Sequence, residues 1–258
     1  MKPLAEMPRS AIRGLLFDID ETLTTEGKLT AEAYAAMERL KRAGRIVVPV
    51  TGRAAGWCDH IARMWPVDAV IGENGAFYFW FGEGKLQRRF YDPPAARADK
   101  QRQLEAIAQA ILKAVPGTAL ASDQRYRETD LAIDYCEDVP PLPLEAAERI
   151  AAQMRAAGMT ARVSSIHVNG WFGDYDKLAM ARLLFKERFA IDLAVANRGL
   201  AFAGDSPNDA PMFGFFDHSI GVANVRRFEA ALEHAPKYVT RAAAGAGFAE
   251  LAAHLLAG

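Results

Sequence analysis

The chain has few cysteines, no long apolar run and no excess of charge of either sign. Only two cysteines, Cys58 and Cys136, occur in 258 residues, and they lie far apart without metal-ligand spacing. A disulfide framework and a structural zinc site are therefore not expected. Charged residues interrupt every apolar stretch before it reaches the length of a membrane span, and residues 1–13 lack the apolar segment of a secretory signal. We therefore expect a cytoplasmic protein without a membrane partner.

The balance of charge argues against a nucleic-acid partner. The formal net charge is −1, and the basic residues are scattered along the chain rather than gathered in blocks. Proteins that follow a phosphate backbone need a basic surface, which this composition does not supply. The length suits one large domain or two smaller ones, and it leaves the oligomeric state open.

Strand and helix signals alternate in both terminal parts of the chain. In the first part, we predict strands over 14–17, 45–50 and 68–71, and helices over 30–43 and 54–63. Asn74-Gly75 between apolar residues predicts a hairpin, with residues 76–81 returning antiparallel. In the last part, we predict strands over 199–203, 219–223 and 238–240, and helices over 176–189, 225–234 and 247–256.

The middle of the chain mixes strands and helices differently. We predict helices over 100–115 and 144–157, and strands over 118–122, 129–136 and 160–169. Alternating elements favour a parallel sheet covered on both faces, whereas mixed runs favour an α+β layer. We therefore predict an α/β fold with a doubly wound, Rossmann-like parallel-sheet core. Residues 1–82 and 173–258 form the core, and residues 83–172 form an inserted α+β cap.

Acidic residues follow two predicted core strands. Asp18 and Asp20 come directly after the first strand, and Asp205, Asn208 and Asp209 follow a later one. The carboxyl ends of parallel strands meet at one edge of a sheet, where such folds bind ligands. Carboxylates held together near a cleft repel one another, and a divalent cation offsets that repulsion. Oxygen ligands favour Mg²⁺ over zinc, so the sequence predicts a magnesium site at this edge.

Two further groups complete an inventory for phosphoryl transfer. Thr51 and Gly52 form the turn after the second strand, and Lys177 stands at the start of a helix. A hydroxyl group, backbone amides at a helix start and a lysine together complement phosphate charge. Each feature alone also fits a helix cap, a simple turn or a solvated lysine. Their combination with the carboxylates favours a phosphate site.

These residues form four ordered motifs: Asp18-Ile-Asp20-Glu-Thr22, Thr51-Gly-Arg53, Lys177 and Gly204-Asp205-Ser-Pro-Asn208-Asp209. The set resembles the haloacid dehalogenase superfamily of phosphotransferases. The insertion resembles the subgroup with an α/β cap after the third core strand, which contains Cof-like sugar phosphatases, sucrose- and trehalose-phosphate phosphatases and phosphomannomutases. The resemblance covers the whole chain in order and includes residues 71–76 and 221–224.

The resemblance implies a role for each matching residue. Asp18 would be the nucleophile that forms a transient aspartyl phosphate, and Asp20 would be the acid/base. The transferring phosphoryl group would be held by Thr51, Gly52 and Lys177. Mg²⁺ would be held by Asp18, Asp20 through its carbonyl, Asp205, Asn208 and Asp209. Glu21 departs from the pattern, because the subgroup most often has glycine there.

Further candidates for contact with the substrate are Arg53, Asn74 and Asn169. The simpler interpretations are an exposed arginine, a turn residue and a core residue, respectively.

The sequence thus predicts a Mg²⁺-dependent phosphatase for a small phosphorylated metabolite, with a sugar phosphate favoured. A phosphomutase of the same superfamily stays open. A phospho-acceptor module like a response-regulator receiver is a further alternative, but its lysine follows the acidic residues, whereas Lys177 precedes Asp205.

Overall fold

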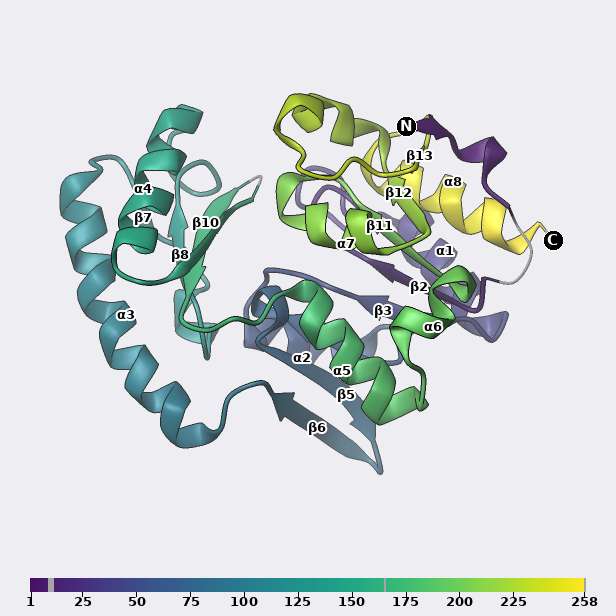
Figure 1. Cartoon of the computed structure of the whole chain (residues 1–258), viewed down its shortest axis with the longest axis horizontal. Coiled ribbons are helices and arrows are strands. Elements are labelled where there is room, and N and C mark those ends of the chain that lie inside the picture. Colours follow the sequence, from purple (N-terminus) through teal and green to yellow (C-terminus); the bar gives the residue numbers. More distant parts are fainter. Residues whose placement is uncertain (9–11, 165, 258) are drawn as a thin grey trace.

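A computed structural model describes residues 1–8, 12–164 and 166–257 (Figure 1). Its strands are β1 (Lys2–Pro3), β2 (Gly14–Phe17), β3 (Ile46–Pro49), β4 (Val70–Gly72), β5 (Phe77–Gly82), β6 (Lys85–Phe90), β7 (Ala119–Leu120), β8 (Leu131–Asp134), β9 (Thr160–Val163), β10 (His167–Trp171), β11 (Leu200–Gly204), β12 (His218–Gly221) and β13 (Tyr238–Val239). Its α-helices are α1 (Ala31–Arg42), α2 (Ala55–Met64), α3 (Pro94–Ala114), α4 (Leu144–Ala156), α5 (Lys177–Phe189), α6 (Leu193–Ala196), α7 (Ala210–Phe215) and α8 (Ala244–Leu256).

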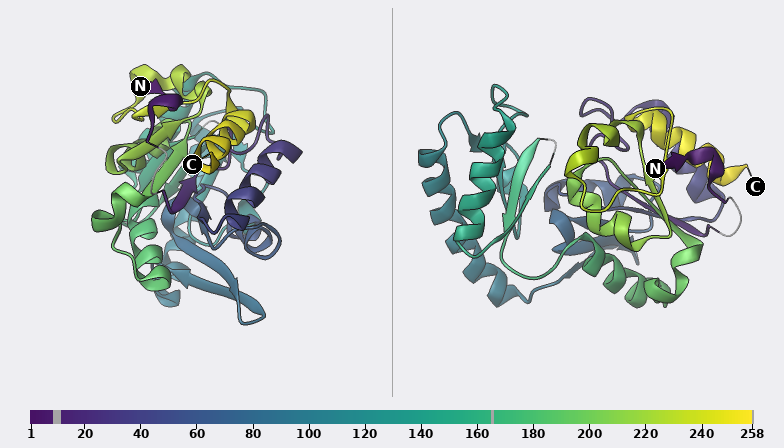
Figure 2. Two further views of the ribbon diagram at one scale, coloured as in Figure 1. Left: turned by 90° about the vertical axis from the view of Figure 1, so that its right-hand side faces the viewer. Right: turned by 45° about the horizontal axis from the view of Figure 1, so that its top comes forward.

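Six strands form a parallel sheet in the order β1-β13-β12-β11-β2-β3. The central pair β2 and β11 is in register from Leu200 opposite Gly14 to Ala203 opposite Phe17. The residues that follow these two strands therefore emerge side by side at one edge of the sheet. Elements from both ends of the chain build this sheet, as the colours of Figure 2 show.

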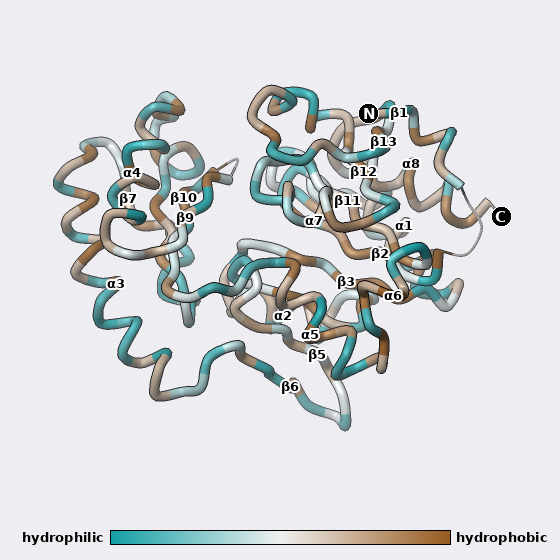
Figure 3. The backbone as a smooth tube through the Cα atoms, in the orientation of Figure 1, coloured by the Kyte–Doolittle hydropathy of each residue, from teal (hydrophilic) through white to brown (hydrophobic). Residues whose placement is uncertain are grey.

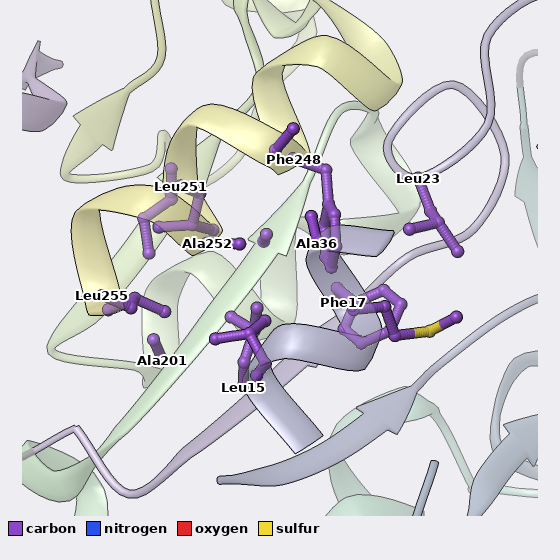
Figure 4. Close-up of a cluster of buried hydrophobic side chains, with 14 of the residues drawn as sticks. Leu15, Phe17, Leu23, Ala36, Ala201, Phe248, Leu251, Ala252 and Leu255 are labelled. Atoms are coloured by element: carbon purple, nitrogen blue, oxygen red, sulfur yellow. The ribbon is translucent and has the colours of Figure 1, made fainter. Parts of the chain in front are cut away.

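Alternation along β2 explains why helices cover both faces of the sheet. Leu15 and Phe17 point into a core shared with α1 and α8, while Leu16 points into a second core shared with α5 and α7. Successive side chains of a strand face opposite sides, so an unbroken apolar strand needs cover on both. Figure 4 shows the first of these cores, with Phe17 and Phe248 among the labelled side chains.

The cap is built on an antiparallel sheet in the order β7-β8-β10-β9. Apolar side chains from α3 and α4 pack on one face of it, together with Val168 of β10. His167 and Asn169 flank Val168 and, by the same alternation, point to the opposite face, toward the parallel sheet. The cap thus offers polar side chains to the place where the core carboxylates emerge.

A third sheet, β4-β5-β6, continues the core beyond β3, since Val50 bridges Ile71 in parallel. The predicted antiparallel return after Asn74-Gly75 is confirmed by the pairing of β4 with β5. Strand β6 was not predicted from the sequence. It follows a two-residue turn, Glu83-Gly84, in which both residues have positive φ, the geometry that joins hairpin strands most tightly. Figure 3 shows that much of β6 is hydrophilic, so its sequence lacks the apolar pattern from which strands are predicted.

Three other predicted elements differ from the structure. The strand predicted over 160–169 is two antiparallel strands, β9 and β10, and residue 165 between them lies outside the described residues. Helix α3 begins at Pro94 rather than residue 100, because a proline at the first helical position is well tolerated. In place of the helix predicted over 225–234, the structure has a 3₁₀-helical segment, Ala223–Ala231.

The prediction of a doubly wound α/β core with an α+β cap is confirmed by this arrangement. The boundaries at residues 82/83 and 172/173 stay a prediction, since the β5–β6 hairpin continues across the first of them. Among the described residues, none of the helices combines the length and apolar character needed to cross a bilayer.

Candidate active site

Lys177 lies between two buried carboxylates at the edge of the parallel sheet. Its Nζ is 3.2 Å from Asp18 Oδ1 and 2.8 Å from Asp209 Oδ1. Asp18 follows β2, Asp209 follows β11, and Lys177 is the first residue of α5, so three segments distant in sequence meet here. All three side chains are almost fully buried. The structure therefore brings together the residues that the first, third and fourth motifs contribute.

Local geometry sets the start of α5 and hence the position of Lys177. Asp176 caps the helix by accepting a hydrogen bond from the Ala179 N–H at 2.7 Å. Gly75 packs against this helix start with φ +108°, and a Cβ there would lie 2.1 Å from the Asp176 carbonyl oxygen. Only glycine fits so close an approach at this φ. The Asn74-Gly75 turn thus has a role beyond the hairpin, because it seats Lys177.

Asp205 is held from two sides. Its Oδ1 accepts a hydrogen bond from the Thr22 hydroxyl at 3.3 Å, and its Oδ2 accepts one from Asn224 Nδ2 at 3.1 Å. Asn224 also donates to the Glu21 carbonyl at 2.9 Å. Glu21 has φ 54°, the left-handed region that glycine adopts most easily. This explains why glycine is the usual residue there in the family that the sequence resembles.

Asp209 is engaged by both oxygens. Oδ1 contacts Lys177, and Oδ2 accepts hydrogen bonds from the N–H groups of Asp205 and Ser206 at 3.1 and 3.4 Å. A Cβ at Gly204 would come within 2.3 Å of Oδ2, so the glycine makes room for this carboxylate. These contacts favour Asp209 as the residue that holds Lys177 and the 204–209 loop in place.

The electrostatics of the cluster are unbalanced. Burial raises the pKa of Asp18 to about 7, although Lys177 beside it works in the opposite direction. Burial, with the nearby carboxylates of Asp18 and Asp209, raises the pKa of Asp205 well above its usual range. Burial disfavours the charged form of Lys177, but the two carboxylates outweigh it and raise its pKa. Three buried carboxylates around one lysine leave negative charge that a cation would neutralise.

The donor set fits a hard divalent cation. Among the described residues, one group of acidic side chains has metal-ligand spacing: Asp18, Asp205 and Asp209 each offer an oxygen within 4.8 Å of the others. Carboxylate oxygens in a buried cluster suit Mg²⁺, which takes one or two carboxylates together with water and phosphate oxygens. No histidine or cysteine belongs to the group, so a zinc site is not favoured.

Asp20 pairs with Arg53 and lines the same cavity as Asp18. Arg53 Nε lies 3.0 Å from Asp20 Oδ1, and Nη2 lies 2.9 Å from the same oxygen. Arg53 Nη2 also contacts Glu137 of the cap at 3.0 Å. Burial lowers the pKa of Arg53, but Asp20 and Glu137 outweigh this and raise it. Arg53, an uncertain candidate from the sequence, therefore joins the predicted acid/base to the cap.

Thr51 and Gly52 form a tight turn whose carbonyl and hydroxyl groups are engaged. Thr51 is fully buried, and its Oγ1 accepts a hydrogen bond from the Arg53 N–H at 3.0 Å. The Gly52 carbonyl accepts a hydrogen bond from Arg127 Nη1 at 2.9 Å. Asn74 lies against Gly52, since a Cβ on Gly52 would be 3.2 Å from its side-chain amide, and the buried Asn74 Nδ2 has no hydrogen bond to any residue that the structure describes.

Arg127 belongs to the site, although it is not among the site residues predicted from the sequence. It is 5% exposed and pairs with Asp123 and Asp130 as well as with Gly52. Asp130 Oδ2 in turn accepts a hydrogen bond from Asn169 Nδ2 at 3.0 Å. From the sequence, exposed loop charge is the simplest interpretation of Arg127. The flanking acids are the one signal of burial, since a buried arginine needs carboxylate partners.

Core and cap residues line one small cavity of about 20 Å³. Its lining consists of Asp18, Asp20, Gly52, Arg53, Arg127, Ser164, Ile166, His167, Asn169, Ser206 and Asn208. Of the candidates named from the sequence, Asn169 and Asn208 therefore face the same space as Asp18 and Asp20. Asn208 also accepts a hydrogen bond from the Ser206 hydroxyl at 2.8 Å. The functional roles of all these residues stay predictions.

Comparison with known proteins agrees with this picture. The sequence model of the haloacid dehalogenase-like hydrolase family matches residues 15–89. The phosphoglycolate phosphatase of Pyrobaculum neutrophilum is 29% identical over 247 residues, which cover 95% of this chain and 96% of that protein.

Solved structures resemble the whole chain. A HAD/COF-like hydrolase from Plasmodium vivax superposes with a TM-score of 0.69 at 17% identity, covering 96% of both chains. The sucrose-phosphatase of Synechocystis, solved with sucrose and phosphate, gives a TM-score of 0.64 at 16% identity and covers 95% of this chain and 98% of that one. At such identities the likeness establishes the fold alone.

Proposed function

We propose that this chain is a haloacid dehalogenase-like phosphatase that hydrolyses a small phosphorylated metabolite in a Mg²⁺-dependent reaction, in the cytoplasm. One observation carries the proposal. Lys177 Nζ lies within 3.2 Å of both Asp18 and Asp209, with Asp205 beside them, so the carboxylate proposed as nucleophile, the cation proposed to bind phosphate and the oxygens proposed as metal ligands share one buried site.

The reaction would run in two steps. A carboxylate oxygen of Asp18 would attack phosphorus, and the bond from phosphorus to the ester oxygen would break as an aspartyl phosphate forms. Asp20 would give its proton to the departing oxygen. It would then take a proton from water, whose oxygen attacks phosphorus, releases inorganic phosphate and restores Asp18. Lys177 and the Thr51-Gly52 turn would complement the charge on the phosphoryl oxygens.

Mg²⁺ would be held by Asp18 and Asp205 with the Asp20 carbonyl, and Asn208 and Asp209 would stand in or next to its ligand shell. When bound, the ion supplies positive charge that draws the phosphate toward Asp18 and offsets its negative oxygens. The excess of buried carboxylate over the single lysine supports this assignment.

The substrate class is less closely defined by the fold. The sequence motifs favour a sugar phosphate, whereas the phosphoglycolate phosphatase relative supports a smaller acid ester. In either case the cap would exclude bulk water from the site, because its polar face lies toward Asp18 and Asp20.

The test is release of inorganic phosphate from p-nitrophenyl phosphate and from a panel of phosphorylated metabolites, with Mg²⁺ or with EDTA. We expect turnover that needs Mg²⁺ and differs in kcat/KM between panel members. ³¹P NMR of the products separates hydrolysis from a mutase, which would return an isomerised phosphate ester. Absence of catalytic turnover on every ester would contradict the proposal and favour a phospho-acceptor module.

A further inference from the structure

The side chain of Asn224 joins the loops that follow three neighbouring strands of the parallel sheet. Strands β12, β11 and β2 lie side by side, and Asn224 comes after β12 (Figure 1). Its Nδ2 donates to Asp205 Oδ2 after β11 at 3.1 Å and to the Glu21 carbonyl after β2 at 2.9 Å. Its Oδ1 accepts a hydrogen bond from the Ala244 N–H at the start of α8 at 2.9 Å. One buried side chain thus fixes three loops and a helix start relative to one another.

The contacts of Asn224 need an amide at this position. Nδ2 faces two oxygens and Oδ1 faces an N–H, so only one orientation of the amide satisfies all three contacts. An aspartate of the same size would place an oxygen against the carboxylate of Asp205 and against the Glu21 carbonyl. The asparagine is therefore matched to the groups around it by its chemistry as well as by its size.

Thr22 and Asn224 fix the direction of the Asp205 carboxylate without neutralising it. The Thr22 hydroxyl donates to Oδ1 at 3.3 Å, and Asn224 donates to Oδ2. Both donors are neutral, and the two ion pairs of Lys177 go to other carboxylates. Because the donors come from different loops, the carboxylate cannot rotate without breaking a hydrogen bond. Its charge stays available for a cation.

Asn224 also steadies the peptide that carries the Asp20 carbonyl. It holds the carbonyl of Glu21, whose N–H donates to Thr24 Oγ1 at 3.2 Å. That N–H shares a planar trans peptide unit with the Asp20 carbonyl, which therefore points away from Thr24. Glu21 has φ 54°, a conformation that persists only where surrounding contacts hold it. Loss of the Asn224 contact would let this loop relax.

Ligands held this firmly suit Mg²⁺ better than Ca²⁺. Mg²⁺ needs a nearly ideal octahedron of oxygens at about 2.0–2.1 Å, whereas Ca²⁺ accepts about six to eight oxygens at about 2.3–2.6 Å in flexible arrangements. A carboxylate that is free to turn can bind through both oxygens, which Ca²⁺ readily accepts. Freeing Asp205 should therefore weaken the binding of Mg²⁺ more than that of Ca²⁺.

We propose that Asn224 is a positioning residue that selects Mg²⁺ over Ca²⁺ at the proposed metal site, because it holds Asp205 and the Asp20–Glu21 peptide in one arrangement. The inference rests on the proposed function, since it concerns the ion of the same site. Both polar atoms of Asn224 are engaged by protein groups, so the residue acts through its neighbours and not as a ligand.

The test measures the affinity of the metal-free full chain for Mg²⁺ and for Ca²⁺ by titration calorimetry at pH 8, with wild-type protein and Asn224→Ala. We expect Asn224→Ala to bind Mg²⁺ about 10–100-fold more weakly, the usual effect of losing a partner that orients a metal ligand. The affinity for Ca²⁺ should fall less, so the ratio of the Mg²⁺ to the Ca²⁺ affinity should drop at least about three-fold. An unchanged ratio would overturn the inference.

Asn197→Ala is the matched control. Asn197 also joins two loop groups, since its Nδ2 donates to the Phe215 carbonyl at 2.6 Å and its Oδ1 accepts from the Asp217 N–H at 2.8 Å. It precedes β11, whereas Asp205 follows this strand, so the two lie at opposite edges of the sheet. Asn197→Ala should leave both metal affinities unchanged. The same drop in ratio in both variants would trace the effect to lost stability and contradict the positioning role.

Thr22→Val decides the question if Asn224→Ala does not fold. Thr22 is fully buried, and valine has nearly its shape but lacks the hydroxyl that donates to Asp205 Oδ1. A lower ratio of the two affinities in Thr22→Val would uphold the selection of the ion by a fixed Asp205. In that case an unchanged ratio would overturn the inference.

Phosphate release by the wild-type protein keeps the inference apart from the proposed function. Mg²⁺-dependent turnover together with an unchanged ratio in Asn224→Ala would reject the positioning role alone. A lower ratio without turnover of any ester would uphold the positioning role and reject the phosphatase. A wild-type protein that binds no Mg²⁺ would reject the proposed metal site and the inference with it.

Discussion

At the scale of single residues, burial decides the chemistry of Asp18. A solvent-exposed aspartate would be ionised at neutral pH and well hydrated, but Asp18 is 4% exposed and its pKa is raised to about 7. Lys177, the Ile19 N–H at 2.9 Å and a bound cation would each favour the ionised carboxylate in this buried place. The proposed nucleophile would therefore depend on its neighbours for its charged form.

The substitution Asp18→Asn tests this residue directly. The side chain keeps its size and its place, so we expect the folded protein to persist while kcat on p-nitrophenyl phosphate falls by at least about 10³-fold. Asp174→Asn, an exposed acid just before α5, is the control and should keep full activity. Full activity in Asp18→Asn, with unchanged circular dichroism, would remove the nucleophile assignment.

The pH dependence of stability should reveal the excess of carboxylate. The folded-state pKa of Asp18 lies above its ordinary value of 3.8, so the folded protein binds this proton more tightly than the unfolded chain. Without metal, the free energy of unfolding should therefore fall as pH rises from about 4 through about 7.

Mg²⁺ should reverse that loss, because it binds the ionised carboxylates. At a concentration of 100 times its Kd, the ion should add about 2.7 kcal/mol at pH 8, a rise in Tm of roughly 5–10 °C, and much less at pH 5. Differential scanning calorimetry with MgCl₂ or EDTA at the two pH values measures this, with Asp205→Asn as control. Equal shifts at both pH values would speak against Asp18 and Asp205 as ligands.

At the scale of elements, the tip of the β4–β5 hairpin fixes the first turn of α5. Gly75 contacts the backbone of Asp176 more closely than any residue with a Cβ could, and Lys177 follows at once. The hairpin was predicted from Asn74-Gly75, yet its contact with a helix about 100 residues later is visible only in the fold.

Gly75→Ala should therefore damage the site from a distance. The new Cβ would force α5 outward and add to the strain of a positive φ, so we expect a loss of stability of about 2–5 kcal/mol and at least about a ten-fold fall in kcat/KM. Gly84→Ala is a matched control, because Gly84 also has a positive φ, of 72°, but its Cβ would meet nothing within 4 Å. Urea unfolding and phosphate release compare the two; equal losses would show that backbone strain alone matters.

At the scale of the whole molecule, a buried arginine ties the cap to the core. Arg127 comes from the cap, neutralises Asp123 and Asp130 there, and donates to the Gly52 carbonyl of the core, 75 residues away in sequence. The cap therefore takes part in shaping the predicted phosphate-binding turn as well as covering it.

Arg127→Met should uncouple the two parts. Two buried carboxylates would lose their partner, which costs about 3–5 kcal/mol, and the loosened turn should raise KM more than it lowers kcat. Arg125→Met, two residues away and exposed, should change stability by less than about 0.5 kcal/mol. Thermal unfolding and steady-state kinetics measure both; unchanged KM in Arg127→Met would confine Arg127 to a structural role.

The sequence by itself determined the alternation of buried strands and helices, and with it the edge of the sheet where Asp18, Lys177 and Asp205 meet. Neighbouring residues show the apolar periodicity from which the strands and helices are predicted. The carboxyl ends of parallel strands then lie at one edge of the sheet. The contacts of Arg127 with Gly52 and of Glu137 with Arg53 join residues 75 and 84 positions apart. They were decided only by the way the cap docks on the core, because an arginine or glutamate in a loop looks the same in sequence whether solvent or a carboxylate surrounds it.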